Sequence, residues 1–261
     1  MIVTRSVTQS DGAVAGARLA GESGPALIFV HGVGSTGAIW DYQLDAFGDY
    51  RCASMELRGN GALENPPPEL ITREGFASDV LAVADANGFK TFHLIGCSLG
   101  GVVAFELWQR EPERLRSMVI VGSFARYPDG QTYADNIKSA VRAAGDMRTF
   151  AEARAAQLGL PPHRMRETID QMGSKSVSSY LASTQATWTG DYRAVLPSIR
   201  VPVLVTRGER DGIEPQPLSD EIADGIPGAE RDVVSNAGHV ANADNPARFN
   251  EILREFIEAT E

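Results

Sequence analysis

The chain has 261 residues and a formal net charge of −10 at pH 7, because its 34 Asp and Glu outnumber its 24 Lys and Arg. A net anion repels phosphate backbones and anionic lipid, and the sequence has no long block of basic residues to offset that repulsion. With 43% hydrophobic and 22% charged residues, the composition is typical of a globular protein. We therefore expect a small-molecule substrate, no nucleic-acid partner and no membrane partner.

The cysteine content and the amino-terminal residues indicate the compartment. Cys52 and Cys97 are too few for a disulfide framework and fit a reducing environment. The amino-terminal residues lack the apolar core and cleavage site of a signal peptide, and the longest apolar stretches fall far short of the roughly 20 residues that span a bilayer. The sequence predicts a cytoplasmic protein that is a monomer or a homodimer.

Two strands, at residues 2–7 and 14–19, are predicted first, because Asp11-Gly12 between them tolerates positive φ and indicates a hairpin. Short apolar runs then alternate with helical spacing, which is typical of right-handed crossovers in a parallel sheet. We predict an α/β fold with a mostly parallel eight-stranded sheet, flanked by helices and with the hairpin as an antiparallel edge. The six further strands are expected at residues 26–31, 51–55, 91–95, 117–121, 203–206 and 231–234, and the helices at 72–87, 99–109 and 246 to about 259.

One connection is far longer than a crossover needs. Gly122 and Val201 are 79 positions apart, and a structureless loop of that length is improbable in a compact domain. The segment instead predicts a helical lid inserted after the sixth strand. The core domain is then residues 1–122 and 201–261 and the cap is 123–200, with cap helices expected at 133–144, 149–158, 161–172 and 177–187.

A G-x-S-x-G pentapeptide, Gly96-Cys97-Ser98-Leu99-Gly100, lies between a predicted strand and the next helix. A strand that enters a helix through so sharp a turn would expose Ser98 at the carboxyl end of the sheet, beside the free N–H groups of the helix start. The plainer alternative is a glycine-rich turn that only packs helix on strand. The flanking strand and helix favour a nucleophile.

A serine nucleophile needs a general base, and the chain has four histidines. His93 lies within a strand pattern, His163 lies in the lid, and His31 closes a strand where it suits the pocket floor. His239 follows the last strand, on a loop at the carboxyl edge where ligands gather in open α/β sheets. We therefore predict His239 as the base.

The base in turn needs a carboxylate to orient it. Glu209 and Asp211 both follow the strand at residues 203–206. Asp211 stands farther past the strand end, where a loop can turn back toward His239, whereas Glu209 suits a solvated charge or a partner of Arg210. The order Ser98, Asp211, His239 is the one expected of a triad on an α/β-hydrolase sheet.

Cys97, next to the proposed nucleophile, raises the alternative of a thiol mechanism. The residue before the exposed position of such a turn points into the sheet, and free cysteine is commonly a small buried apolar residue. We predict that Cys97 is not the nucleophile.

Together these motifs resemble the α/β-hydrolase superfamily over nearly the whole chain, and within it small bacterial esterases and 3-oxoadipate enol-lactonase-like hydrolases. The resemblance implies an oxyanion hole made by the backbone N–H groups of Val33 and Leu99. The matching segments are His31-Gly32, Leu57-Arg58-Gly59-Asn60-Gly61, Gly96 to Gly101, Pro112-Glu113-Arg114-Leu115, Gly208-Glu209-Arg210-Asp211, and Gly238-His239 to Asn245-Pro246.

The predicted function is a serine hydrolase that cleaves a small carboxylic ester or an enol-lactone through an acyl-enzyme, with no metal and no cofactor. A C–C bond hydrolase or a cofactor-free perhydrolase could use the same triad. A non-catalytic ligand-binding protein could keep the same fold.

Substrate contacts are expected from the lid and from the loop after residue 31. His31 and Gly32 are candidates on the core side, and Phe124 and Trp188 are candidates near the two ends of the lid. One of the lid arginines could bind a substrate carboxylate, although charged helix faces are usually only solvated. The arginines considered are Arg126, Arg142, Arg148, Arg154, Arg164, Arg166 and Arg193.

Overall fold

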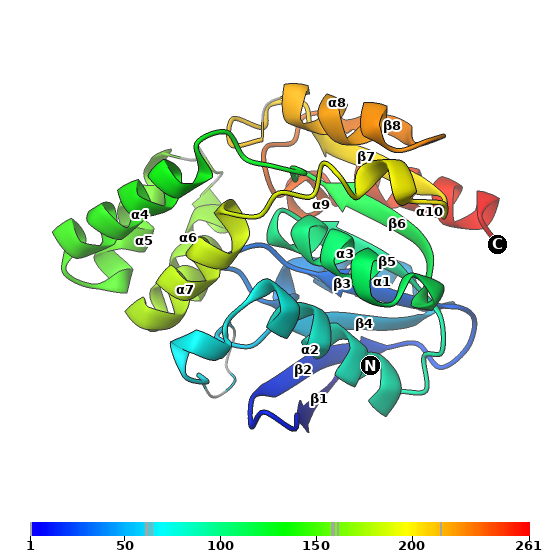
Figure 1. Ribbon diagram of the computed structural model, residues 1–261, viewed down its shortest axis with the longest axis horizontal. Coiled ribbons are helices and arrows are strands. Elements are labelled where there is room, and N and C mark those ends of the chain that lie inside the picture. The colour runs from blue at the N-terminus through cyan, green and yellow to red at the C-terminus, as the bar shows by residue number, and fades with distance from the viewer. Residues whose placement is uncertain (1, 61–62, 64, 158–159, 161, 215) are drawn as a thin grey trace.

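The strands pair in the order β1-β2-β4-β3-β5-β6-β7-β8, in a computed structural model that describes residues 2–60, 63, 65–157, 160, 162–214 and 216–261 (Figure 1). The β1–β2 and β2–β4 pairs are antiparallel and the other pairs are parallel, which confirms the predicted mostly parallel eight-stranded sheet. The strands are β1 (Val3–Thr8), β2 (Val14–Ala20), β3 (Ala26–Val30), β4 (Arg51–Glu56), β5 (Phe92–Cys97), β6 (Leu115–Val121), β7 (Val203–Gly208) and β8 (Glu230–Val234).

The β1–β2 hairpin forms at the predicted turn. Gly12 has a φ of 84°, a left-handed conformation that glycine adopts without strain, and Asp11 Oδ1 accepts a 2.9 Å hydrogen bond from the Ala13 N–H. Strand β1 is exposed along most of its length at the sheet edge, whereas β3 and β5 are buried throughout at the centre. Burial on both faces explains why the sequences of β3 and β5 are continuously apolar.

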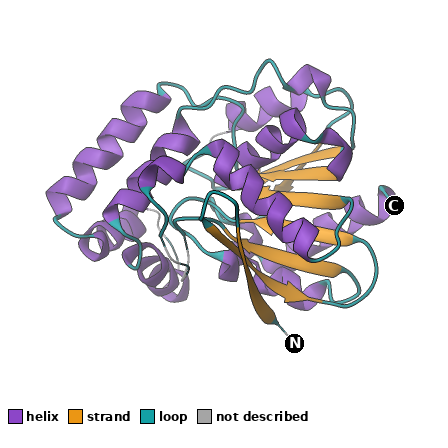
Figure 2. Cartoon of the chain, turned by 60° about the horizontal axis from the view of Figure 1, so that its bottom comes forward, coloured by secondary structure: helices purple, strands orange, loops and turns teal. Residues whose placement is uncertain are grey.

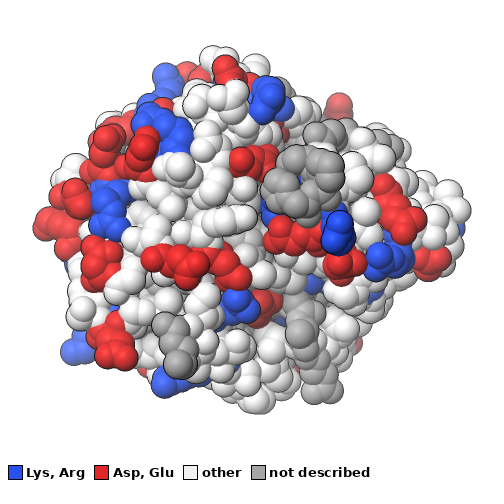
Figure 3. Space-filling view, turned by 180° about the vertical axis from the view of Figure 1, so that it is seen from behind, with Lys and Arg blue, Asp and Glu red and all other residues white. Residues whose placement is uncertain are grey.

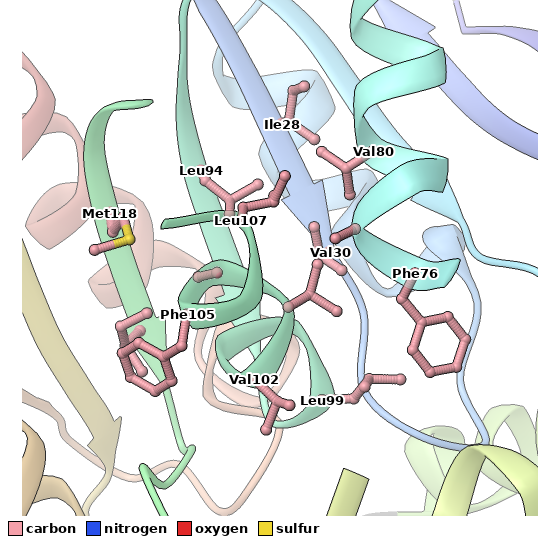
Figure 4. Packing of buried hydrophobic residues seen from close by; sticks show 14 of the residues in the cluster. Ile28, Val30, Phe76, Val80, Leu94, Leu99, Val102, Phe105, Leu107 and Met118 are labelled. Atoms are coloured by element: carbon pink, nitrogen blue, oxygen red, sulfur yellow. The ribbon is translucent and has the colours of Figure 1, made fainter. Parts of the chain in front are cut away.

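Helices cover both faces of the sheet (Figures 1 and 2). On one face α2 and α3 pack on the central strands, and Figure 4 shows Val80 of α2 and Leu107 of α3 close to Ile28 and Leu94. On the other face α1 and α10 enclose a second apolar cluster. The core helices are α1 (Asp41–Ala46), α2 (Arg73–Ala86), α3 (Leu99–Arg110), α8 (Gln216–Gly225), α9 (Ala241–Asp244) and α10 (Pro246–Ala259), with 3-10 turns at Gly37–Trp40, Pro68–Leu70, Pro112–Arg114 and Leu196–Ser198.

The long connection after β6 is helical, as predicted, and projects from one end of the sheet (Figures 1 and 2). It has an apolar cluster of its own, which includes Ile137, Phe150, Met172 and Tyr180. The predicted helix limits at residues 158 and 161 lie outside the described residues. The four helices are α4 (Gly130–Ala144), α5 (Met147–Gln157), α6 (Pro162–Gly173) and α7 (Val177–Trp188).

The surface charges of the two signs are mixed. On the face shown in Figure 3, Lys and Arg lie interspersed among the more numerous Asp and Glu. No helix of the described residues is both long enough and apolar enough to span a membrane.

Candidate active site

Ser98 stands on a sharp turn between β5 and α3. Its φ of 55° and ψ of −110° lie outside the common regions for a residue with a side chain. A Cβ atom at Gly96 would lie 2.2 Å from the Gly100 carbonyl oxygen, and one at Gly100 would lie 2.3 Å from the Val30 carbonyl oxygen. The two glycines of the motif are therefore required because backbone passes where any side chain would stand.

Neighbouring residues hold this strained turn in place. The Ser98 N–H donates a 2.9 Å hydrogen bond to the Val121 carbonyl at the end of β6. The Ser123 hydroxyl donates a 2.7 Å hydrogen bond to the Ser98 carbonyl. Both ends of the Ser98 backbone are thus fixed from the adjacent strand, which keeps the hydroxyl at the carboxyl edge of the sheet.

His239 and Asp211 meet at the same edge. His239 Nδ1 lies 2.9 Å from Asp211 Oδ2, and the Asp211 side chain is fully shielded from solvent. Its other oxygen, Oδ1, accepts 2.9 Å hydrogen bonds from the N–H groups of Ile213 and Glu214. Because a carboxylate only accepts hydrogen bonds, Nδ1 carries a proton and Nε2 is left to accept one.

Asp211 is held as a carboxylate. Burial is the largest single influence and would raise the pKa of Asp211. The charge and hydrogen bond of His239 and the two backbone N–H donors all lower it, and together they outweigh burial. The pKa of Asp211 therefore lies below its ordinary value. An ionised Asp211 can stabilise the imidazolium that forms when His239 takes a proton.

Gly122, directly after β6, leaves room for this pair. Its φ is 50°, and a Cβ atom there would lie 2.9 Å from Asp211 Oδ2 and 3.4 Å from His239 Nδ1. We expect Gly122→Ala to lower kcat about 100-fold by displacing the His239–Asp211 pair, as assayed with a p-nitrophenyl ester. Gly88→Ala is the matched control, since Gly88 also has a positive φ, 68°, but an added Cβ would meet nothing within 4 Å. Equal kcat values in the two variants would contradict this explanation.

The cavity beside Ser98 and His239 has a volume of about 800 Å³, within the range of small-molecule sites. Residues of the core and of the helical insertion line it together. From the core come Val33, Gly34, Ser98, Arg210, His239 and Asp244, and from α4–α7 come Tyr133, Ile137, Arg154, Arg164, Met172, Tyr180 and Trp188.

The predicted substrate contacts divide into two groups. Trp188 lines the cavity, and Gly32 lies against Ser98, since a Cβ atom there would be 3.3 Å from the Ser98 Cβ. Phe124 is 1% exposed and stacks behind Trp188 with the ring centroids 5.0 Å apart. His31 is fully buried. The structure therefore corrects the expectation for Phe124 and His31, which support the wall rather than form it.

His31 fixes the loop that follows it. Its Nδ1 lies 2.8 Å from the Gly32 carbonyl oxygen and its Nε2 lies 3.3 Å from the Leu57 nitrogen, so Nδ1 donates and Nε2 accepts. Burial is the main cause that lowers its pKa to about 3, so the ring is neutral at physiological pH. In a trans peptide the C=O and N–H point in opposite directions, so holding the Gly32 carbonyl also fixes the Val33 N–H.

Neither His93 nor Cys97 is among the described residues that line the cavity with Ser98. His93 is buried in β5, where its Nδ1 lies 2.7 Å from the Ser117 hydroxyl, and the side chain of His163 lies outside the described residues. Cys97 is 1% exposed in the apolar cluster beneath α10, and its burial raises the pKa of the thiol well above the ordinary value. A thiolate nucleophile at Cys97 is thereby disfavoured.

Glu214, beside Asp211, was not singled out from the sequence. It is fully buried, and neither of its carboxyl oxygens has a hydrogen-bond partner within the described part of the chain. Burial, and then the Asp211 charge, raises its pKa well above the ordinary 4.5. Glu214 is therefore a buried acid that favours its protonated form.

We predict that the Glu214 carboxyl makes the stability of the folded protein depend on pH. Because the pKa of Glu214 is raised in the folded state, its contribution to folding stability is fully present below pH 4.5. That stability is lost as the pH rises through the folded pKa. We expect Glu214→Gln to raise the melting temperature relative to the unmodified protein at pH 8, by more than at pH 5. Glu255→Gln, an exposed change on α10, should show no such difference. A Glu214→Gln effect that is the same at both pH values would contradict the assignment.

The fold agrees with the comparisons to known proteins. A family described as the alpha/beta hydrolase fold matches residues 25–246, so the chain belongs to that family and is a hydrolase. Among the described residues, no group of three or more His, Cys, Asp or Glu is placed to hold a metal ion.

Three similar proteins illustrate the range of this family. RutD of Azorhizobium caulinodans, a proposed carbamate hydrolase, is 27% identical over 245 residues, covering 90% of this chain and 91% of RutD. The carboxylesterase YbfK of Bacillus subtilis is 27% identical over 240 residues, covering 89% of this chain and 80% of YbfK. The enol-lactonase structure from Burkholderia xenovorans superposes with a TM-score of 0.88 at 23% identity, covering 97% of this chain and all of the other, and shows the shared fold.

Proposed function

We propose that this chain is a serine hydrolase that cleaves a small carboxylic ester or lactone through an acyl-enzyme. The observation that carries the proposal is the 2.9 Å contact of His239 with a buried Asp211, since His239 lines the same cavity as Ser98 on its strained turn. Similarity to a carboxylesterase over most of the chain supports the ester class.

In the first half of the reaction, Ser98 Oγ attacks the substrate carbonyl carbon while His239 Nε2 takes the hydroxyl proton. Asp211 stabilises the resulting imidazolium through Nδ1. The bond to the leaving oxygen then breaks, and His239 returns the proton to the departing alcohol. In the second half, His239 takes a proton from water and the hydroxide attacks the acyl carbon. The bond to Ser98 Oγ then breaks, His239 returns the proton to Oγ, and the acid is released.

The oxyanion is bound in this scheme by the backbone N–H groups of Val33 and Leu99. Leu99 is the first residue of α3, where an amide has no acceptor within the helix. The Val33 N–H belongs to the same peptide unit as the Gly32 carbonyl. That carbonyl accepts hydrogen bonds from His31 Nδ1 and from the Ser35 N–H, so the orientation of the peptide is fixed. Within the described part of the chain, no hydrogen bond takes up either amide, so both are available to a developing charge.

Residues 123–200 act in this proposal as a cap over a catalytic core made of residues 1–122 and 201–261. Helices α4–α7 supply much of the cavity wall, while the core supplies Ser98, Asp211 and His239. Chemistry and substrate selection are thus assigned to different parts of the chain.

A panel of substrates tests the reaction class. Purified protein is assayed with short acyl p-nitrophenyl esters, lactones and vinylogous diketones, and separately for perhydrolysis with hydrogen peroxide and acetate. We expect ester or lactone hydrolysis with a higher kcat/KM than cleavage of the diketones. Faster diketone cleavage would favour a C–C bond hydrolase, dominant perhydrolysis would favour a perhydrolase, and no turnover at all would favour a ligand-binding protein.

A further inference from the structure

The cavity wall carries a charge opposite to that of the whole protein. Three arginines, Arg154, Arg164 and Arg210, lie among its described lining residues, together with one carboxylate, Asp244. The chain as a whole carries a net charge of −10. A cluster of cations in the reaction cavity of an acidic protein requires a specific explanation.

Arg164 is already neutralised within the protein. Its guanidinium pairs with Glu167 on the same helix and lies 3.6 Å from Asp244 of α9, with only 3% of the side chain exposed. Because Asp244 also accepts a 2.9 Å hydrogen bond from the Gly238 N–H beside His239, this pairing joins α6 to the catalytic loop. The role of Arg164 is therefore structural.

Arg154 differs from Arg164. It is half-buried on α5, and its guanidinium donates a 2.7 Å hydrogen bond to the Tyr133 hydroxyl. Among the described residues, no carboxylate lies within 4.0 Å of it. Because the Tyr133 oxygen accepts from Arg154, its own proton stays available to donate. The pair thus presents several hydrogen-bond donors and a positive charge to the cavity.

The surroundings of this pair are apolar and aromatic. Trp188 lies with its ring centroid 4.3 Å from that of Tyr133, and Tyr180, Met172 and Ile137 continue the wall. Such a wall suits the carbon skeleton of a ligand, while a guanidinium suits a carboxylate, which it can bind through two parallel hydrogen bonds.

We propose that Arg154, supported by Tyr133, binds a carboxylate of the substrate, so that the preferred substrate is an ester or lactone carrying a second, anionic group. The inference rests on the proposed hydrolase function and defines its substrate class. Arg154 is therefore a specificity-determining residue.

Two matched substrate pairs test this assignment. The mono-p-nitrophenyl ester of glutaric acid is compared with its neutral methyl ester, which places the anion on the acyl side. The second pair, 4-carboxyphenyl butyrate and 4-carbamoylphenyl butyrate, places it on the leaving group. We expect the unmodified protein to favour the anionic member of at least one pair by about 10- to 100-fold in kcat/KM, because a charge-assisted hydrogen bond is lost in the neutral member.

Variants separate Arg154 from a general effect of charge. Arg154→Gln should lower kcat/KM for the anionic member of the favoured pair far more than for the neutral member and so abolish the preference, while Arg154→Lys should keep part of it. Arg142→Gln, an exposed change on α4 that removes the same charge, should keep the full preference. Loss of the preference in Arg142→Gln as well, or its survival in Arg154→Gln, would overturn the assignment.

Failure of the role assigned to Arg154 can be distinguished from failure of the proposed hydrolase function. Hydrolysis of the neutral esters without any anionic preference would leave the hydrolase intact and overturn the role of Arg154. If no ester is turned over, calorimetric titration with glutarate decides the matter, since Arg154→Gln should weaken its binding at least tenfold and Arg142→Gln should not. Equal glutarate binding in the two variants would then overturn the inference.

Discussion

Ser98→Ala is expected to lower kcat for a p-nitrophenyl ester by about 10⁶-fold while leaving the fold unchanged, because removal of a triad nucleophile abolishes covalent catalysis. The backbone hydrogen bonds that hold the turn, from the Ser98 N–H and to its carbonyl, do not involve the hydroxyl that is removed. Circular dichroism and thermal melting should therefore match those of the unmodified protein. The rate that remains should reflect binding and the oxyanion hole alone.

The control for this variant is Ser139→Ala, which removes an exposed serine hydroxyl on α4 outside the cavity lining. It should keep full kcat. A Ser98→Ala protein that is folded and retains more than about one-tenth of the activity would show that Ser98 is not the nucleophile, since removal of a triad serine is expected to cost about 10⁶-fold in kcat.

Asp211→Asn is the second large effect, with an expected fall in kcat of about 10⁴-fold. The physical reason lies in the hydrogen bonds around the side chain. The N–H groups of Ile213 and Glu214 both point at Oδ1, so the amide oxygen of the asparagine must take that position. Its NH₂ group then faces His239 Nδ1, which must become an acceptor, and the ring proton moves to Nε2. A protonated Nε2 cannot accept the Ser98 proton.

Glu209→Gln is the matched control for Asp211→Asn, because it makes the same chemical change two residues earlier in the same loop. Glu209 Oε2 accepts a 2.9 Å hydrogen bond from the Asn236 N–H, a contact that a glutamine oxygen can keep. Steady-state kinetics should show near-normal kcat for Glu209→Gln. If instead Glu209→Gln is inactive and Asp211→Asn is active, the acid of the triad has been assigned to the wrong residue.

Local sequence patterns predicted most of the fold. Strands β3 and β5 are apolar along their whole length, and α10 begins with Pro246 behind Asn245, whose side chain accepts a hydrogen bond from the Arg248 N–H. Helices α1, α8 and α9 were not predicted. They are short, and α9 spans only Ala241–Asp244, so their apolar faces repeat too few times to stand out from a loop.

The candidate catalytic residues could be predicted because they follow strand ends in a particular chain order. The residues of the cavity wall could not, because packing between distant segments decides which side chains face the cavity. Ser98 is marked by its glycines, and His239 and Asp211 by their places after strand ends. In contrast, Phe124 and Trp188 are both aromatic and both near the ends of the insertion, and only their stacking decides that Trp188 faces the cavity and Phe124 lies behind it. Arg164 likewise pairs with Asp244, which is distant in sequence, as well as with the nearby Glu167.

The most direct measurement is labelling with a fluorophosphonate, followed by peptide mass spectrometry of the digested protein. Reaction at a serine requires an activated hydroxyl next to a competent base and oxyanion hole, so the label reports the whole arrangement at once. We predict a single adduct on the peptide that contains Ser98, formed in step with loss of esterase activity, and far slower labelling in Asp211→Asn. A folded, active sample in which Ser98 stays unlabelled while another residue carries the adduct would contradict the account.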